Sequence, residues 1–192
     1  GVFGEVSAAG IIKDVFFSQL DVINIGDYSG GIVGTNRGLI ENVTGTGSVD
    51  SSSYDIGFVA GVNHGIIRNV TLNDIFLDGD DAGGVVRENR GIIDLVAVKG
   101  GSIATFAGCL ANDNVVTQGV INRSYCNIYV LGGMVYDNDG IIDNTLQHVS
   151  GNNWGNLANT DGGTITNSMV VAGFTSGAIG GFKTLIEDVA VV

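Results

Sequence analysis

The two histidines are the first residues to consider, because imidazole serves both acid–base catalysis and metal binding. His64 lies between Asn63 and Gly65, which indicates a turn, and His148 lies in a later apolar segment. A zinc site needs three or four ligands around one ion, and a catalytic triad needs a histidine with two positioned partners. The sequence provides neither arrangement, so we predict a protein that is not an enzyme and has no cofactor.

An acidic turn is the second candidate site, because Asp78, Asp80 and Asp81 surround Gly79. Carboxylate oxygens are ligands that calcium prefers, but an EF-hand needs a twelve-residue loop that ends in a glutamate. This stretch does not have such a loop. A calcium site at Asp78, Asp80 and Asp81 and a solvated turn are therefore both open interpretations.

The composition excludes several classes of partner. Among 192 residues, 8 are Lys or Arg and 20 are Asp or Glu, which gives a net charge of −12. So few basic residues cannot form the positive surface that binds nucleic acid or an anionic membrane. No apolar run reaches the length of a membrane-spanning helix. A hydrophobic content of 44%, with 32 glycines and no proline, indicates a packed core built from strands and turns.

The elements that must position these residues come from one repeated unit. Residues 31–43 read GIVGTNRGLIENV, and drifted copies occupy residues 57–70, 83–96 and 132–145. The glycine before an apolar pair is the anchor of each unit, and the anchors recur every 21–28 residues. The anchors are Gly10, Gly38, Gly65, Gly91, Gly119, Gly140 and Gly163, with Thr184 in the last unit. Units this short cannot bury a core alone, so we expect them to stack.

The residues that follow the anchor alternate as in a strand. The second residue is isoleucine in every unit and the third is polar, which predicts that the isoleucine faces inward. An Asn/Asp column then breaks the alternation, and these residues tolerate the left-handed conformation of a bend. The pattern predicts an all-β fold over residues 1–192, a single domain. We expect a right-handed parallel β-helix of about eight coils of 21–28 residues, with three short strands per coil.

Two ladders of stacked side chains follow from this register. We expect the isoleucines to stack in the core and the asparagines to form an amide ladder at the bend. The ladder residues are Ile40, Ile67, Ile93, Ile121, Ile142, Ile165, Asn42, Asn69, Asn144 and Asn167. Leu95 stands in the asparagine column, so we expect a break there, with local distortion or with Leu95 in the core. A second asparagine, two residues before the anchor, predicts a separate tight turn at Asn36, Asn63, Asn89 and Asn138.

The outward column after the isoleucines carries charges of alternating sign. Its charged members are Lys13, Glu41, Arg68, Asp94, Asp143 and Glu187. Opposite charges on neighbouring strands stabilise a sheet surface modestly, and this is the simpler interpretation. A pair of carboxylates for glycoside hydrolysis is the alternative.

The two cysteines fall in one unit, at positions where other units have aliphatic residues. Cys109 and Cys126 are therefore expected to be small core residues. An extracellular setting would permit a disulfide between them, so free thiols and a bridge both remain open.

The repeat resembles the GLUG motif, whose pattern Gly-Gly-Ile-Val-Gly-x-Asn-x-Gly-x-Ile-x-Asn-Val is closest to residues 31–43. The resemblance covers essentially the whole chain, although Arg87 and Leu95 depart from it, as does Arg123 in the unit around Gly119. GLUG repeats occur in large bacterial surface and secreted proteins, among them filamentous-haemagglutinin-like adhesins and IgA-specific zinc metallopeptidases. The resemblance implies a bacterial, extracellular β-helix that belongs to a larger protein. The peptidase motif His-Glu-x-x-His does not occur here.

These observations favour a non-catalytic structural or binding module of a bacterial cell-surface or secreted adhesin-like protein, of which this chain is a fragment. The expected partners are the rest of the parent protein and a host surface protein or glycan, without nucleic acid and without membrane insertion. One alternative is a carbohydrate-active β-helix, such as a polysaccharide lyase, a hydrolase or a phage tailspike-like protein. The other is a non-catalytic region of an IgA-specific metallopeptidase.

One stretch of the surface is predicted to make contacts. Past the bend, the outward positions are polar in the early units, whereas later units place Tyr125, Leu146, His148 and Met169 there. Stacked about 4.8 Å apart, these side chains would form a contiguous, largely apolar contact strip. We expect the strip either to bind a partner or ligand, or to be covered by the loop that carries Trp154.

Overall fold

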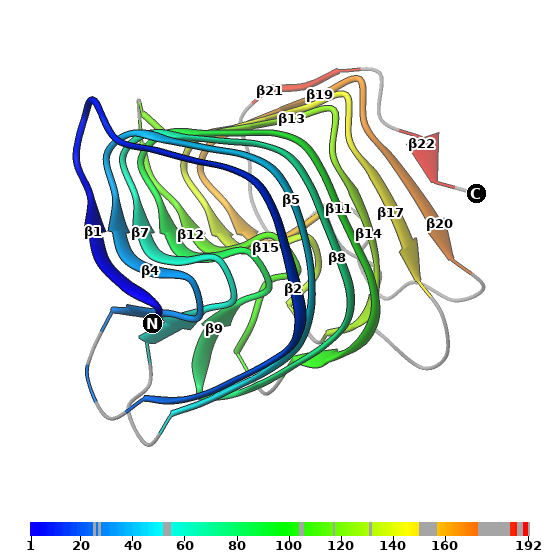
Figure 1. Cartoon of the computed structure of the whole chain (residues 1–192). Helices are drawn as coiled ribbons and strands as arrows, with labels where there is room; N and C mark the ends of the chain where they lie inside the picture. Colours follow the sequence, from blue (N-terminus) through cyan, green and yellow to red (C-terminus); the bar gives the residue numbers. More distant parts are fainter. Residues whose placement is uncertain are drawn as a thin grey trace.

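The structure is a computed structural model of the whole chain. It describes residues 1–24, 26, 28–51, 55–103, 106–116, 118–130, 132–149, 157–172, 185–187 and 190–191. These residues form an all-β parallel β-solenoid of about six turns, and they contain no helix (Figure 1). Within them, no helix meets the length and hydrophobicity that crossing a membrane requires.

The first sheet takes one short strand from each successive coil, all parallel. Its strands, in spatial order, are β1 (Phe3–Val6), β4 (Val33–Asn36), β7 (Ala60–Asn63), β10 (Val86–Asn89), β12 (Ala111–Asn114), β15 (Val135–Asn138) and β18 (Ala158–Asp161). They follow one another in colour order on the left of Figure 1.

The second sheet contains the longer strands, which wrap the top, right and lower sides of the solenoid in Figure 1. Four of them run through a whole side without interruption: β2 (Ile11–Asn24), β5 (Leu39–Ser51), β8 (Ile66–Asp78) and β11 (Ile92–Ile103). Later coils contribute pairs of short strands instead. These are β13 (Val120–Asn122) with β14 (Tyr125–Tyr129), β16 (Ile141–Asp143) with β17 (Leu146–Val149), β19 (Thr164–Thr166) with β20 (Met169–Ala172), and β21 (Leu185–Glu187) with β22 (Ala190–Val191).

A third, small sheet joins the other two. It consists of β3 (Ser29–Gly30), β6 (Asp55–Gly57) and β9 (Asp81–Gly83), again parallel. The prediction of about eight coils with three short strands each is therefore not matched exactly. The described residues form about six turns, and in the early coils the long strands continue through the bend that was expected to divide them.

The isoleucine column stacks in register through the second sheet. Ile12 pairs with Ile40, and the same register continues through Ile67, Ile93, Ile121, Ile142, Ile165 and Ile186. The six isoleucines from Ile40 to Ile165 are completely buried. Stacking like residues in this way lets every coil bury its apolar side chain against the same side chain of its neighbours.

The Asn/Asp column does form the bend, because its residues have positive φ. Asn42 has a φ of 55°, Asn69 of 51° and Leu95 of 54°. The amide ladder is only partial, since Asn69 donates to Asn42 at 2.6 Å, whereas Asn144 and Asn167 bond to Asp143. The column is also exposed.

Leu95 does not behave as the sequence suggested. It keeps the left-handed conformation, it is 47% exposed rather than packed in the core, and the strand register continues unbroken on both sides of it. The expectation of local distortion or core packing at Leu95 is therefore wrong. The pairing of β11 with β8 holds the left-handed turn even without an asparagine.

Hydroxyl side chains explain why later coils have divided strands. Early coils have valine after the bend, but Ser124, Thr145 and Ser168 stand there in later coils and are buried. The amide of Thr145 donates to Ser168 Oγ at 3.2 Å, and Ser168 Oγ donates to the carbonyl of Thr166 at 2.7 Å. These bonds replace part of the backbone ladder, so the strand ends and resumes at this position.

The main amide ladder is a different column from the one predicted. Asn36, Asn63, Asn89, Asn114 and Asn138 are buried, and each side-chain amide donates to the Oδ1 of the next at 2.7–2.9 Å. The Oδ1 atoms of the first three also accept the backbone N–H of the anchor glycine in their own coil. The ladder therefore satisfies the polar groups of the turn between the first and second sheets.

The anchor must be glycine because the coils approach too closely for a side chain. A Cβ atom on Gly65 would lie 2.1 Å from the carbonyl oxygen of Gly38, and one on Gly91 would lie 2.1 Å from that of Gly65. Glycine is thus required at this corner by close approach of the backbone.

Candidate functional site

The contact strip predicted from the sequence lies on the outer face of the second sheet. Tyr125 pairs in register with Leu146, and Leu146 pairs with Met169. These three side chains are half-buried, whereas Cys126 and Val170 at the following positions are buried in the core. His148 is exposed beside them. The strip thus has the expected orientation, its contact role stays a prediction, and Trp154 lies outside the described residues.

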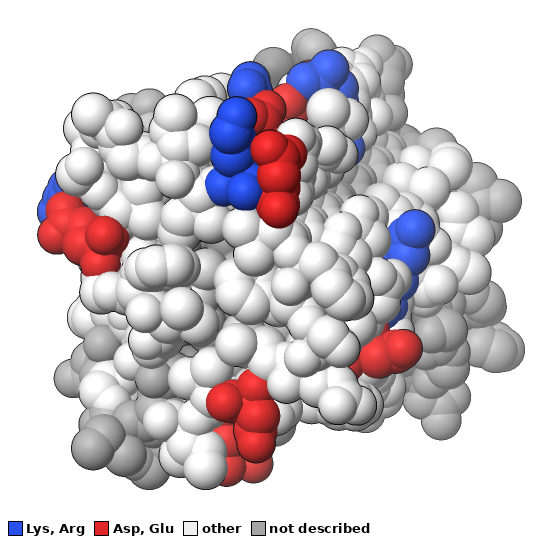
Figure 2. Space-filling view, viewed as in Figure 1, with Lys and Arg blue, Asp and Glu red and all other residues white. Residues whose placement is uncertain are grey.

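The charged column forms ion pairs between coils. Arg68 Nη2 lies 2.6 Å from Glu41 Oε1. Asp94 accepts from Arg123 Nε at 2.8 Å, and Arg123 belongs to the neighbouring Asn/Asp column. Figure 2 shows acidic and basic side chains lying next to one another along the upper edge of the solenoid. These contacts favour the simpler interpretation of the column, which is modest stabilisation of a sheet surface.

The acidic turn does not form a metal site in this structure. Asp78 and Asp80 are exposed and Asp81 is half-buried. Across the part of the chain that the structure describes, no group of three or more His, Cys, Asp or Glu side chains is placed to hold a metal ion. The calcium interpretation of Asp78, Asp80 and Asp81 is therefore not supported, because these carboxylates do not converge.

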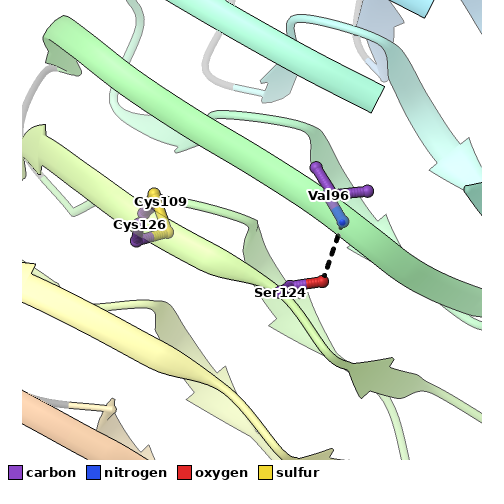
Figure 3. Close-up of a disulfide and its surroundings, with 4 residues drawn as sticks. All are labelled: Val96, Cys109, Ser124 and Cys126. Carbon is purple, nitrogen blue, oxygen red and sulfur yellow. Dashed lines mark hydrogen bonds between the residues drawn. A yellow bond between two sulfur atoms is a disulfide. The ribbon is translucent and has the colours of Figure 1, made fainter. Parts of the chain in front are cut away.

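The two cysteines form a disulfide inside the solenoid. Cys109 and Cys126 are both buried, and their Cα atoms are 6.3 Å apart (Figure 3). Cys126 lies on β14, and Cys109 lies just before β12 on the opposite wall. Beside the bridge, the amide of Val96 on β11 donates to Ser124 Oγ at 3.2 Å (Figure 3). The bridge therefore ties the first sheet to the second within a single coil.

We predict that the disulfide contributes about 3 kcal/mol to the free energy of unfolding, because it closes a loop with a sequence separation of 17 residues. A variant with both Cys109→Ala and Cys126→Ala should lose about this amount in urea denaturation. The wild-type protein unfolded with and without reductant gives the matching comparison. Equal stability of the two forms would contradict the prediction.

Among the residues that the structure describes, the most highly connected group of charges surrounds Arg87 on β10. Arg87 Nε donates to Asp55 at 2.5 Å and Nη1 donates to Asp113 at 2.5 Å, while Glu88 is bound by Arg90. The guanidinium carbon of Arg87 lies 5.5 Å from the centre of the Tyr28 ring. The cluster thus joins residues of several coils.

The electrostatics of this cluster follow from its burial. Burial lowers the pKa of Arg87, but Asp113 and Asp55 outweigh it, so the pKa of Arg87 is raised. Burial raises the pKa of Asp113 above its ordinary value, and the neighbouring carboxylates of Asp137 and Glu88 add to the effect, although Arg87 opposes it. A shifted carboxyl pKa is a feature of many active sites, but structural ion-pair networks produce it as well. Here the carboxylates are bound by arginines, which favours the structural role.

An open groove with a volume of about 570 Å³ lies on the lower part of the second sheet. One outward residue per coil lines it, in register over five successive coils. These residues are Asp21, Ser48, Phe76, Ser102 and Tyr129. A second column adds Ile23, Asp50 and Asp78. We call this hollow the acidic-aromatic groove.

Aromatic rings and carboxylates give the groove a binding chemistry. Phe76 is 52% exposed and Tyr129 is 49% exposed, and they lie two coils apart, about 10 Å by the spacing of strands. Ser48 Oγ donates to Asp21 at 3.0 Å. Figure 2 shows a group of acidic side chains at the lower edge of the solenoid, with no basic side chain drawn next to it. The groove therefore offers flat apolar surfaces and hydrogen-bond acceptors to an elongated ligand.

The sequence did not reveal the acidic-aromatic groove. Its residues follow the second bend, at Gly47 and Gly101, where φ is 137° and 93°. The repeat is weakest there, because the segment beyond the bend varies in length between units, so no column was visible. The one available signal was the alternation of Phe76 and Asp78 with the buried Ile75 and Leu77.

Comparison of the chain with protein-family models, curated proteins and solved structures finds no significant match in any of the three.

Proposed function

We propose that this chain is a non-catalytic β-solenoid module that presents a binding surface in a bacterial cell-surface or secreted adhesin-like protein. The observation that carries the proposal is the acidic-aromatic groove, in which each of five stacked coils contributes one outward side chain. A rigid stack that repeats side chains every 4.8 Å suits an elongated ligand. The resemblance of the repeat to the GLUG motif supports an extracellular setting and a larger parent protein.

The proposal also includes the handedness of the solenoid and the number of its units. We infer a right-handed helix with eight units, one for each isoleucine from Ile12 to Ile186. The register of β19 with β21 supports a continuation to the last unit, because Ile165 pairs there with Ile186. The disulfide supports a secreted location, since bridges persist in oxidising compartments.

The best candidate ligand is a neutral glycan. Sugar rings present apolar faces that pack against aromatic rings, and their hydroxyls donate to carboxylates such as Asp50 and Asp78. An anionic glycan would be repelled by the groove and by the net charge of −12. The partners proposed besides the glycan are the parent protein and a host surface protein, with no role for nucleic acid or for membrane insertion.

We expect the protein to be retarded in native gels that contain a neutral polysaccharide, such as soluble chitin or cellulose derivatives, without cutting it. Phe76→Ala with Tyr129→Ala should abolish the retardation, because both ring surfaces are lost. Phe16→Ala is the matched control, since Phe16 is exposed on the same sheet but outside the groove.

The competing functions give different results in the same experiment. Release of reducing ends or of unsaturated products would favour a carbohydrate-active enzyme instead. Absence of retardation with every neutral polysaccharide would contradict glycan binding. The remaining alternative, a non-catalytic region of an IgA-specific metallopeptidase, predicts binding to immunoglobulin A rather than to a polysaccharide.

A further inference from the structure

An outward-facing aliphatic side chain, exposed in four coils and half-buried in two, follows the anchor glycine in six successive coils. These residues are Ile11, Leu39, Ile66, Ile92, Val120 and Ile141, and we call them the aliphatic stripe. They lie in register on adjacent strands of the second sheet. Ile11 is 60% exposed and Ile141 is 44% exposed, while the isoleucine that follows each of them faces inward. The aliphatic stripe therefore lies on the outer surface of the solenoid.

The surroundings of the stripe leave it accessible. The anchor glycines run beside it and carry no side chains, so shallow hollows of about 400 Å³ and 340 Å³ adjoin its two ends. The first hollow is lined by Gly10, Ile11, Gly38, Leu39 and Ile66 among others, and the second by Gly119, Val120, Gly140 and Ile141 among others. A contiguous apolar surface of this kind marks a contact with another molecule.

The spacing of the six residues in the aliphatic stripe indicates which partner fits it. Six residues at a spacing of about 4.8 Å form a line roughly 24 Å long. A second copy of this chain presents apolar side chains at the same spacing, so its stripe can cover all six. We propose that the aliphatic stripe packs against the aliphatic stripe of a second copy, with the two solenoids antiparallel. Such a contact is isologous, so it closes as a dimer.

Charge complementarity favours the antiparallel arrangement. When Ile66 faces Ile92 of the second copy, the twofold axis runs perpendicular to the long axes of both solenoids. Each column of residues then faces the same column of the second copy, with the coils in reverse order. In the charged column, Lys13 then faces Asp143 of the second copy, and Arg68 faces Asp94. A parallel arrangement would instead bring the charged column against the column before the anchor, where Glu41 meets Arg37 and Asp94 meets Arg90, but Asp143 meets Asp139. The like-charge pair of Asp143 with Asp139 disfavours the parallel arrangement, and the charged column has no like-charge pair in the antiparallel one.

Cysteine cross-linking tests the proposal directly, because both native cysteines are already bridged. In the antiparallel dimer Ile11 faces Ile141 of the second copy, whereas the two Ile11 residues are about 24 Å apart. A disulfide needs Cα atoms within about 7 Å. We therefore expect a mixture of Ile11→Cys and Ile141→Cys proteins to give at least tenfold more cross-linked dimer than Ile11→Cys alone. Thr44→Cys, off the stripe, is the control for random collision.

The outcomes separate the possibilities. Cross-linking of Ile11→Cys alone, at or above the level of the mixture, would overturn the antiparallel arrangement. A monomeric mass for the wild type in sedimentation up to about 100 µM would overturn the self-association altogether. As a second variant, Ile66→Glu with Ile92→Glu should raise the dissociation constant of the dimer at least tenfold, with an unchanged circular dichroism spectrum. An unchanged dissociation constant would place the contact elsewhere.

Discussion

Replacing Asn89 by leucine is expected to lower the free energy of unfolding by about 3–6 kcal/mol. Asn89 is buried in the middle of the amide ladder, where Oδ1 accepts from Asn63 at 2.9 Å and Nδ2 donates to Asn114 at 2.9 Å. Leucine has a similar size but leaves one N–H of the Asn63 amide, the Oδ1 of Asn114 and the N–H of Gly91 without the partners that Asn89 provides. Each buried polar group left unpaired costs about 1–3 kcal/mol.

Asn69→Leu is the matched control for this experiment, because Asn69 belongs to the exposed column at the bend. Leu95 already occupies that column with a φ of 54°, so leucine is compatible with the bend. We expect a loss of about 1 kcal/mol at Asn69, from the less favourable left-handed conformation. The measurement is urea denaturation followed by circular dichroism. A loss at Asn69 as large as that at Asn89 would show that the ladder is not the main polar support of the coils.

The second large effect is expected at Ile67, which lies mid-stack in the core ladder. Ile67→Ala should cost about 2–5 kcal/mol, because it removes buried methylene groups and leaves a cavity between Ile40 and Ile93. Ile66→Ala is the control from the adjacent residue, since Ile66 is 36% exposed and points outward.

The Ile66 control should change the free energy of unfolding by less than about 0.5 kcal/mol, as substitutions at the surface usually do. Both variants are unfolded in urea at low protein concentration, so that self-association does not contribute. If Ile67→Ala lost less than 0.5 kcal/mol, or less than Ile66→Ala, the inward and outward assignment would be wrong by one residue.

The periodic residues were sufficient to predict the class of fold and the core register. Every unit has an isoleucine that must be buried, followed by a polar residue that must reach solvent. Both requirements are met in all units only if each unit adds one layer to a stack. That is why the register from Ile12 to Ile186 could be read from the spacing of the anchors. The positive φ of the Asn/Asp column followed in the same way, because few residues tolerate that conformation.

The polar core was assigned to the wrong column for a physical reason. Both asparagine columns are compatible with turns, and local sequence does not tell which turn is covered by neighbouring chain. Asn114 was missed altogether, because an insertion before Gly119 separates it from the anchor by five residues instead of two. Only the tertiary structure shows that Asn114 lies between Asn89 and Asn138 and completes the ladder.

The sequence by itself determined what repeats: the stack, the core isoleucines, the anchor glycines and the bend. Only the tertiary structure decided what depends on the closure of the coil. The disulfide joins the first sheet to the second, a contact that the spacing of Cys109 and Cys126 in the sequence does not predict. The Arg87 cluster joins three segments of the chain through hydrogen bonds. The acidic-aromatic groove forms where Phe76 and Tyr129 come into one column after a bend of variable length. Contacts across the stack depend on how far each coil turns, and that angle is set by packing rather than by local sequence.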